Sequence, residues 1–219
     1  MGARYIGITG TIGSGKSTVL AILESWGKKV FRADNIAKDL LYGSGGRYDE
    51  ELRTILGNEI FEGEYGIPQA NYSRIRDIIV SNKEKRDALG ELTSKIVWEE
   101  IVRRVGDFDG FVYVESALLH EAHWNDGRFE RIMCVWCERE TSIARLSGIV
   151  RNGQSTLSEK KIIGLLDAQY SASEKRARSD VSLYNGASTR KEEMPEYVRH
   201  ALSFWEGPEI FKTRETTSG

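Results

Sequence analysis

Near its start the chain reads Gly10-Thr11-Ile12-Gly13-Ser14-Gly15-Lys16-Ser17, which has the pattern G-x-x-x-x-G-K-S. In such a phosphate loop, backbone N–H groups, one lysine and one hydroxyl surround a polyphosphate. A short apolar, β-prone run over residues 4–9 precedes the loop, and a segment with helical spacing begins at Thr18. Strand, glycine loop and helix start, in this order, direct the N–H groups of a helix N-terminus at anionic oxygens. The stretch therefore predicts a nucleoside triphosphate site.

The loop pattern also predicts roles for particular groups. Lys16 is expected to bridge the β- and γ-phosphates of ATP, and the Ser17 hydroxyl is expected to bind Mg²⁺. The backbone amides around them would cradle the β-phosphate. The predicted phosphate-binding set is Gly10, Thr11, Ile12, Gly13, Ser14, Gly15, Lys16, Ser17 and Thr18.

Composition limits the range of partners. The 219 residues carry a net charge of only −2 with 29% charged residues, so no global field indicates binding to nucleic acid or to a membrane. No 18-residue apolar stretch is present, and the N-terminus enters a predicted strand rather than a signal peptide. We expect a cytoplasmic protein that acts on small-molecule substrates as a monomer or small homo-oligomer.

Five apolar runs predict an α/β fold. They are the segments 4–9, 29–33, 111–115, 132–136 and 181–184. Right-handed strand–helix–strand connections would join runs this apolar into one mostly parallel, five-stranded sheet in a three-layer P-loop kinase fold. The expected organisation is a single domain over 1–219, divided into a core of about 1–36, 107–140 and 178–212, a helical acceptor-binding insertion of about 37–106, and a helical lid of about 141–177.

Two acids lie at predicted strand ends. Asp34 follows the second strand and Glu115 ends the third, and ligands in open parallel sheets bind beyond the carboxyl ends of the strands. Asp34 is the candidate general base for an attacking hydroxyl. It is alternatively a cap for a helix that starts at Asn35, and both roles can coexist. Glu115 is the candidate to orient the Mg²⁺ shell through water.

Four further side chains resemble metal ligands in type. Cys134 and Cys137 form a single C-x-x-C without a second pair, so two buried thiols in a strand are the better interpretation. His120 and His123 flank an acid without the H-E-x-x-H spacing. We therefore interpret them as loop residues near the site.

Over about residues 5–188 the chain resembles the dephospho-CoA kinases, which transfer a phosphate from ATP to a ribose 3′-hydroxyl. The pieces that carry the resemblance are residues 6–18, residues 30–38, Leu118-Leu119-His120-Glu121, Arg145-Leu146, Arg151, Gln169, Glu174-Lys175, Ser179-Asp180-Val181 and Asn185-Gly186. Beyond the phosphate loop no single piece is specific, but their order and spacing together are.

The resemblance implies further site residues. Arg145 and Arg151 would be lid arginines that reach ATP and stabilise charge in the transition state. Arg145 would also lie near the adenine with Asn185 and Gly186. The implied acceptor-binding set is Arg32, Asp34, Glu115, Leu118, Leu119 and Arg76.

Departures from the family pattern fall on the acceptor side. The family's Asp-Ala-Asp is Arg32-Ala33-Asp34 here, its Asp-Arg pair is Asn71-Tyr72, its His-Pro falls at Ser94-Lys95, and its Asp-x-Pro-Leu-Leu is Glu115-Ser116-Ala117-Leu118-Leu119. Dephospho-CoA is the expected acceptor. Arg32 supports the alternative of a nucleoside or deoxynucleoside monophosphate kinase, since a cation suits an acceptor that carries a phosphate. A third alternative is an ATP-binding regulator without catalysis.

Overall fold

The computed structural model describes residues 2–42, 47–62, 69–122, 124, 127–148, 150–151, 154–155 and 157–207. The chain divides into two compact units. The first comprises Met1–Ala3 and Phe31–Asp109, and the second comprises Arg4–Val30 and Gly110–Gly219.

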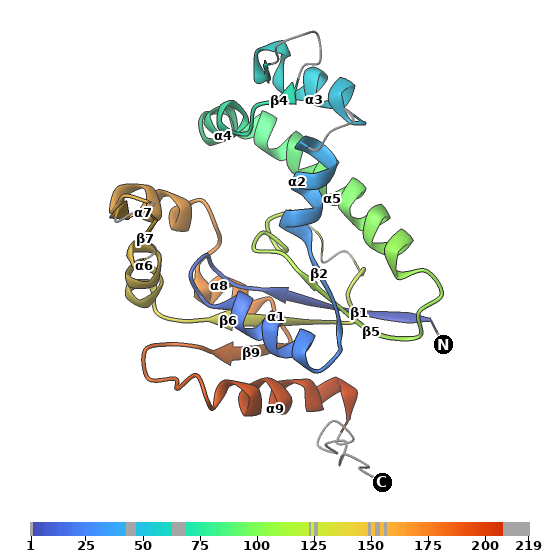
Figure 1. The fold of residues 1–219 in the computed structure, drawn as a ribbon, viewed down its shortest axis with the longest axis vertical. Helices are drawn as coiled ribbons and strands as arrows, with labels where there is room; N and C mark the ends of the chain where they lie inside the picture. The colour runs from blue at the N-terminus through green and yellow to red at the C-terminus, as the bar shows by residue number, and fades with distance from the viewer. Residues whose placement is uncertain are drawn as a thin grey trace. The chain divides into compact units, whose positions relative to one another are not determined.

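A five-stranded sheet carries the phosphate loop. Its strands are β1 (Ala3–Thr9), β2 (Lys29–Arg32), β5 (Gly110–Glu115), β6 (Arg131–Trp136) and β9 (Val181–Tyr184), in the order β2-β5-β1-β6-β9. β6 pairs in parallel with β1 on one side and with β9 on the other. This arrangement confirms the predicted parallel sheet and places the carboxyl ends of these strands at one edge (Figure 1).

Helices cover both faces of this sheet. On one face, α1 (Lys16–Ser25) and α9 (Met194–Glu206) bury an apolar core with the strands. Its members include Ile6, Ile8, Val19, Leu20, Leu23, Met133, Val135, Met194, Val198 and Leu202. Side chains alternate between faces along a strand, so Trp136 lies on the face opposite to Val135. Arg176 of α8 (Ala172–Ala177) lies 3.9 Å from the Trp136 ring centroid, which shows that α8 covers the second face.

The predicted helical lid is only partly helical. α6 (Arg139–Ser147) and α7 (Glu159–Asp167) pack together through Leu146, Ile162 and Leu166. Between them runs a hairpin of β7 (Val150–Arg151) and β8 (Gln154–Ser155), in which Arg151 pairs with Gln154. The prediction of a helix through Arg151 is therefore wrong, because strands of two residues each do not interrupt the helical charge pattern on both sides of them.

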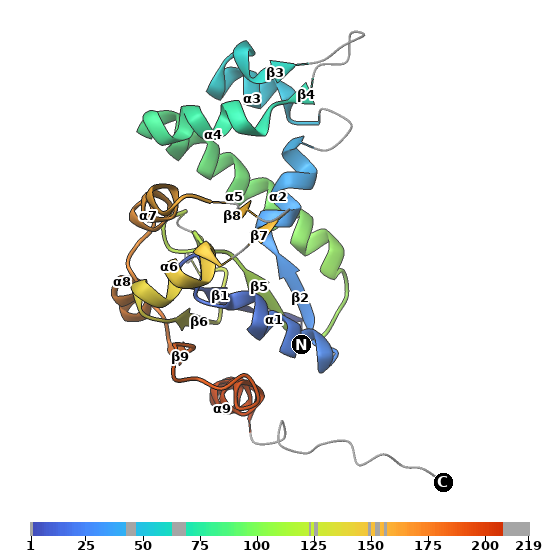
Figure 2. The same cartoon turned by 60° about the vertical axis from the view of Figure 1, so that its left-hand side comes forward.

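The first unit is helical, as the sequence indicates. α2 (Ala33–Tyr42), α3 (Asp49–Leu56) and α4 (Tyr72–Ser81) contact α5 (Lys83–Val105), the longest helix described (Figure 2). A one-turn 3₁₀ helix, η1 (Asn58–Ile60), leads into a small antiparallel pair of β3 (Phe61–Glu62) and β4 (Gln69–Ala70). Among the described helices, none is long and apolar enough to cross a membrane.

Helix α2 begins earlier than expected. The sequence places its start at Asn35, whereas α2 begins at Ala33, directly after β2 ends at Arg32. Asp34 consequently lies in the first turn of the helix rather than at its cap, and its side chain is exposed. An acid in this position interacts favourably with the positive end of the helix dipole.

Candidate functional site

The phosphate loop connects the carboxyl end of β1 with the first turn of α1. Gly15 precedes α1 in the left-handed conformation (φ 91°, ψ 24°), and a Cβ there would overlap the side-chain amide of Asn185. Gly10 has φ 149°, and a Cβ there would overlap the Val135 carbonyl oxygen. Both positions require glycine. The structure describes every residue of α1, and this helix has neither an acid in its first turn nor a side-chain cap, so no capping side chain competes with an anion for the N–H groups of its first turn.

Lys16 is folded back onto this loop. Its Nζ donates to the carbonyl oxygens of Gly10 at 3.0 Å and Thr11 at 3.2 Å. The same atom lies 3.8 Å from Glu115 Oε1, and both side chains are 11% exposed. At this depth a charge pair is less screened by salt than it would be on the surface. Charged phosphate oxygens are stronger acceptors than carbonyls, so Lys16 is positioned to exchange one set of partners for the other.

Two other predicted residues, Asn185 and Arg145, meet at the Ser14 carbonyl. Asn185 Nδ2 donates to Ser14 O at 2.9 Å, and Arg145 Nη1 lies 3.4 Å from the same oxygen. Arg145 also donates to Gly13 O at 3.3 Å and to Gly186 O at 3.5 Å. Tertiary folding therefore brings residues from α6 and from the turn after β9 to the loop. Their roles toward ATP stay predictions.

Two loop contacts were not anticipated from sequence. Gln169 Oε1 accepts from the Ile12 N–H at 3.0 Å, and Cys137 Sγ lies 3.9 Å from Gly13 O and 3.2 Å from Ser142 Oγ. Gln169 belongs to the segments that resemble the family, but no sequence signal indicates its partner, because 157 positions separate it from Ile12.

A magnesium ion fits the donors present. The Ser17 hydroxyl is exposed at the N-terminus of α1, and the Glu115 carboxylate lies beside Lys16 at the end of β5. Mg²⁺ takes oxygen ligands, keeps several waters and commonly completes its shell with substrate phosphates. Within the described part of the chain, no three His, Cys, Asp or Glu side chains gather into a metal cluster. Ser17 and Glu115 could therefore hold the ion only together with nucleotide and water.

The turn after β5 contains the two leucines of the predicted acceptor set. Leu118 is 43% exposed and can contact a ligand. Leu119 is fully buried beside Gly7, which gives it a packing role. In the first unit, Arg32 is half-buried at the end of β2 and Asp34 is exposed in α2.

Some predicted side chains fall outside the described structure. They are those of Arg76, whose backbone is in α4, of Arg151 in β7, and of His123. Cys134 is buried in β6, and Cys137 is buried just beyond the end of that strand. Burial raises the pKa of the Cys134 thiol to about 11. The thiols are therefore core groups, as predicted, although only one is in the strand.

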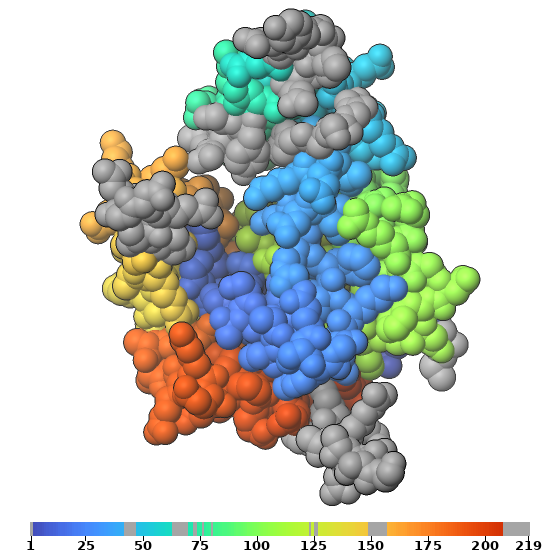
Figure 3. Space-filling model, in the orientation of Figure 1, coloured from blue at the N-terminus to red at the C-terminus, as the bar shows by residue number. Residues whose placement is uncertain are grey.

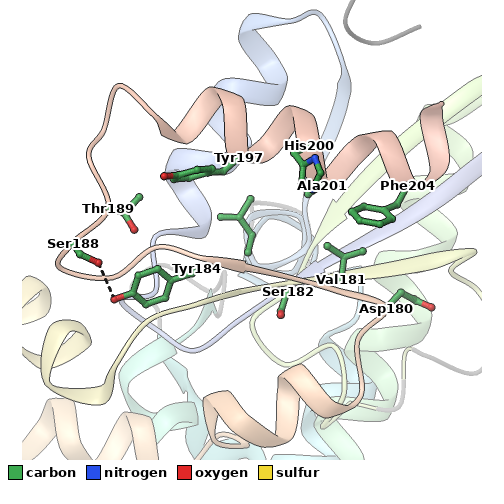
Figure 4. Close-up of a pocket in the computed structure, with 11 residues that line it drawn as sticks. Asp180, Val181, Ser182, Tyr184, Ser188, Thr189, Tyr197, His200, Ala201 and Phe204 are labelled. Atoms are coloured by element: carbon green, nitrogen blue, oxygen red, sulfur yellow. Dashed lines mark hydrogen bonds between the residues drawn. The ribbon is translucent and has the colours of Figure 1, made fainter. Parts of the chain in front are cut away.

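A cavity of about 570 Å³ lies elsewhere in the second unit, between β9 and α9 (Figure 4). Tyr184 and Ser182 line it from the strand, and Tyr197, His200 and Phe204 line it from the helix. The side chains of α9 reach the molecular surface (Figure 3), where Phe204 is 66% exposed. No phosphate-loop residue lines this cavity, so it is separate from the predicted nucleotide site.

Comparison with known proteins identifies relatives across most of the chain. A family model described as dephospho-CoA kinase matches residues 4–191. A dephospho-CoA kinase of Arabidopsis thaliana is 33% identical over 193 residues, which cover 84% of this chain and 77% of that protein. A crystal structure from Thermus thermophilus superimposes with a TM-score of 0.75 at 28% identity, covering 92% of this chain and 97% of the other. A dephospho-CoA kinase from Campylobacter jejuni shares the fold, with a TM-score of 0.58 at 20% identity over 94% of this chain and 98% of that one.

Proposed function

The chain belongs to the dephospho-CoA kinase family, and we propose that it transfers the γ-phosphoryl group of ATP to the ribose 3′-hydroxyl of dephospho-CoA, giving CoA. The observation that carries this proposal is the convergence of Lys16, Arg145 and Asn185 on the phosphate loop. It occurs in a chain whose residues 4–191 match the family. We expect the reaction to take place in the cytoplasm, with a monomer or small homo-oligomer acting on free substrates.

In this proposal, residues of the second unit would bind ATP and stabilise the charge of the transferred group. Bound Mg²⁺ would neutralise part of the charge on the transferred phosphoryl group. Lys16 would leave the Gly10 and Thr11 carbonyls for phosphate oxygens, while the Arg145 guanidinium brings a second cation to the same loop. Such fixed charges lower the barrier because they are already oriented toward the charge that develops in the transition state.

The acceptor hydroxyl needs a group that takes its proton. Asp34 is the proposed base, assigned from its position in the first turn of α2, two residues after β2 ends, and from its match to the second acid of the family motif. The proposed acceptor set adds Arg32, Arg76 and Leu118. A carboxylate within hydrogen-bond reach of a hydroxyl typically contributes about 10²–10⁴-fold to the rate.

The test is ADP release from Mg-ATP, with dephospho-CoA and a panel of nucleoside monophosphates offered separately, and chromatographic detection of CoA. We expect one CoA to form for each ADP. Faster turnover with a nucleoside monophosphate than with dephospho-CoA would show that the nucleoside monophosphate is the acceptor. Nucleotide binding without turnover on any acceptor would indicate a regulator instead.

A further inference from the structure

An ion pair between Lys175 and Glu121 joins α8 to the turn after β5. Lys175 of α8 is completely buried, and its Nζ donates to Glu121 Oε1 at 2.6 Å and Oε2 at 2.8 Å. Its third bond goes to the Ala117 carbonyl oxygen at 2.7 Å. An ammonium has three donors, so Lys175 is fully satisfied. A fully buried ammonium is unfavourable unless it is paired and hydrogen-bonded, so the Glu121 carboxylate and the Ala117 carbonyl are what allow Lys175 to join α8 to the turn after β5.

Two hydrogen bonds donated by backbone N–H groups connect this ion pair with the phosphate loop. Glu121 Oε1 also accepts from the Tyr170 N–H at 2.8 Å. The preceding residue, Gln169, accepts from the Ile12 N–H at the tip of the loop. We call the chain of contacts from Ala117 through Lys175, Glu121 and Tyr170 to Gln169 the polar brace.

The two ends of the polar brace lie at the predicted acceptor side and the predicted ATP side of the site. Ala117 precedes Leu118 in the turn predicted to contact the acceptor, and Ile12 is in the loop predicted to hold ATP. The side chain of Ile12 packs separately against the α6–α7 cluster of Leu146, Ile162 and Leu166. Loss of the Gln169 bond would therefore free the Ile12 backbone without removing its apolar anchor.

We propose that Glu121, Lys175 and Gln169 are positioning residues, which fix the tip of the phosphate loop relative to the turn after β5 and so set the rate of phosphoryl transfer. The proposal rests on the proposed kinase function for its kinetic consequence. Its structural part does not depend on that function, because it states only that the Lys175–Glu121 pair restricts the motion of the Ile12 backbone. None of the three residues has to touch a substrate for this effect, because small misplacements of reacting groups lower rates strongly.

The first experiment removes the hydrogen bond between Gln169 and the Ile12 N–H of the phosphate loop. Gln169→Met keeps the side-chain length but removes the acceptor for the Ile12 N–H. We expect hydrogen exchange at the Ile12 amide, followed by NMR, to accelerate about tenfold. We also expect kcat with dephospho-CoA to fall about three- to tenfold while its KM changes less than twofold. The control is Asp167→Asn, which removes the charge attraction from the exposed Arg139–Asp167 pair two positions away and should change neither quantity.

The second experiment breaks the other end. Lys175→Met alone would leave the half-buried Glu121 carboxylate without its cation and would destabilise the fold. The paired change Glu121→Gln with Lys175→Met removes both charges and keeps an acceptor for the Tyr170 N–H. We expect this variant to melt within a few degrees of the parent and to accelerate exchange at the Ile12 amide, although neither mutated residue contacts Ile12.

The third experiment combines Gln169→Met with the paired change Glu121→Gln and Lys175→Met. In a double-mutant cycle, this triple variant should lose little more kcat and Ile12 amide protection than the Gln169 variant or the paired variant alone, because each of these already breaks the brace. Unchanged Ile12 exchange in the paired variant, or effects that multiply independently, would overturn the proposal. If the wild type does not phosphorylate dephospho-CoA, the exchange measurements still decide the structural part, so the two failures are distinguishable.

Discussion

Lys16 Nζ lies 3.8 Å from Glu115 Oε1, so the lysine of the phosphate loop is paired with the acid that ends β5. The lysine also bonds to the carbonyl oxygens of Gly10 and Thr11. The most important cation of the predicted site is therefore held in place by the protein itself, close to where it would be used. Such preorganisation reduces the reorganisation needed when a charged ligand binds.

Replacement of Lys16 tests the loop chemistry. We expect Lys16→Ala to lower kcat on the order of 10³-fold, because a charge-assisted contact that strengthens in the transition state contributes several kcal/mol. The far-UV circular dichroism spectrum should not change. Lys160→Ala is the matched control, since Lys160 is exposed on α7. Near-normal turnover of the Lys16 variant would show that this loop does not carry the chemistry.

Asp34→Asn tests the proposed base. The amide is nearly isosteric but cannot take a proton, so we expect kcat with dephospho-CoA to fall about 10²–10⁴-fold with little change in ATP binding. Loss of the helix-dipole interaction in the first turn of α2 should cost only about 0.3–1 kcal/mol in stability. Full activity of this variant would falsify the assignment of Asp34.

Arg32→Ala separates the two acceptor classes. If the acceptor were a nucleoside monophosphate, the loss of a phosphate contact would raise its KM. With dephospho-CoA we expect a smaller change than Asp34→Asn produces. The measurement is a comparison of kcat and KM for both acceptors in both variants, and a dominant Arg32 effect would favour the monophosphate kinase.

Asn185→Leu tests how the loop is supported. Asn185 is buried and donates to Ser14 O. Its replacement removes one donor from a carbonyl of the loop, so we expect the free energy of unfolding to fall by about 1–3 kcal/mol. We expect a lower melting temperature and weaker ATP binding, measured by thermal unfolding and calorimetry. Saturating Mg-ATP should raise the melting temperature part of the way back, because a ligand that binds only the folded protein stabilises it. A variant that melts like the wild type and binds ATP normally would contradict this role of Asn185.

Glu100 in α5 predicts a pH dependence of stability. Hydrogen bonds from Arg103, followed by those from Arg104, lower its pKa from 4.5 to about 2. Because the pKa of Glu100 is lower in the folded state than in the unfolded state, its ionised form stabilises the fold when the pH is above the unfolded-state pKa. This contribution is lost as pH falls from about 5 to about 2. Glu100→Gln should therefore lower stability by about 1 kcal/mol at pH 7, since the two arginines are exposed to solvent. Urea unfolding should show this difference shrinking at pH 3, and a difference that grew there would exclude the ion pairs as its cause.

The phosphate loop was predictable because its function depends on consecutive residues. Gly10, Gly15 and Lys16 are fixed by backbone conformation and by one ligand type, and both requirements are local in sequence. The five strands were equally predictable, since each is a short apolar run. The hairpin at β7 and β8 was missed, because two residues in each strand are too few to show a period of two.

By itself the sequence determined the strand–loop–helix unit and the parallel sheet, because these follow from local spacing and from apolar periodicity. Only the tertiary structure decided what supports them. Gln169, Lys175 and Glu121 belong to segments that resemble the family, but the sequence does not indicate their partners, and their contacts join positions up to 157 residues apart. Burial gives these contacts their importance, because a charge or amide removed from water must find a partner in the fold, and no local pattern records which partner that is.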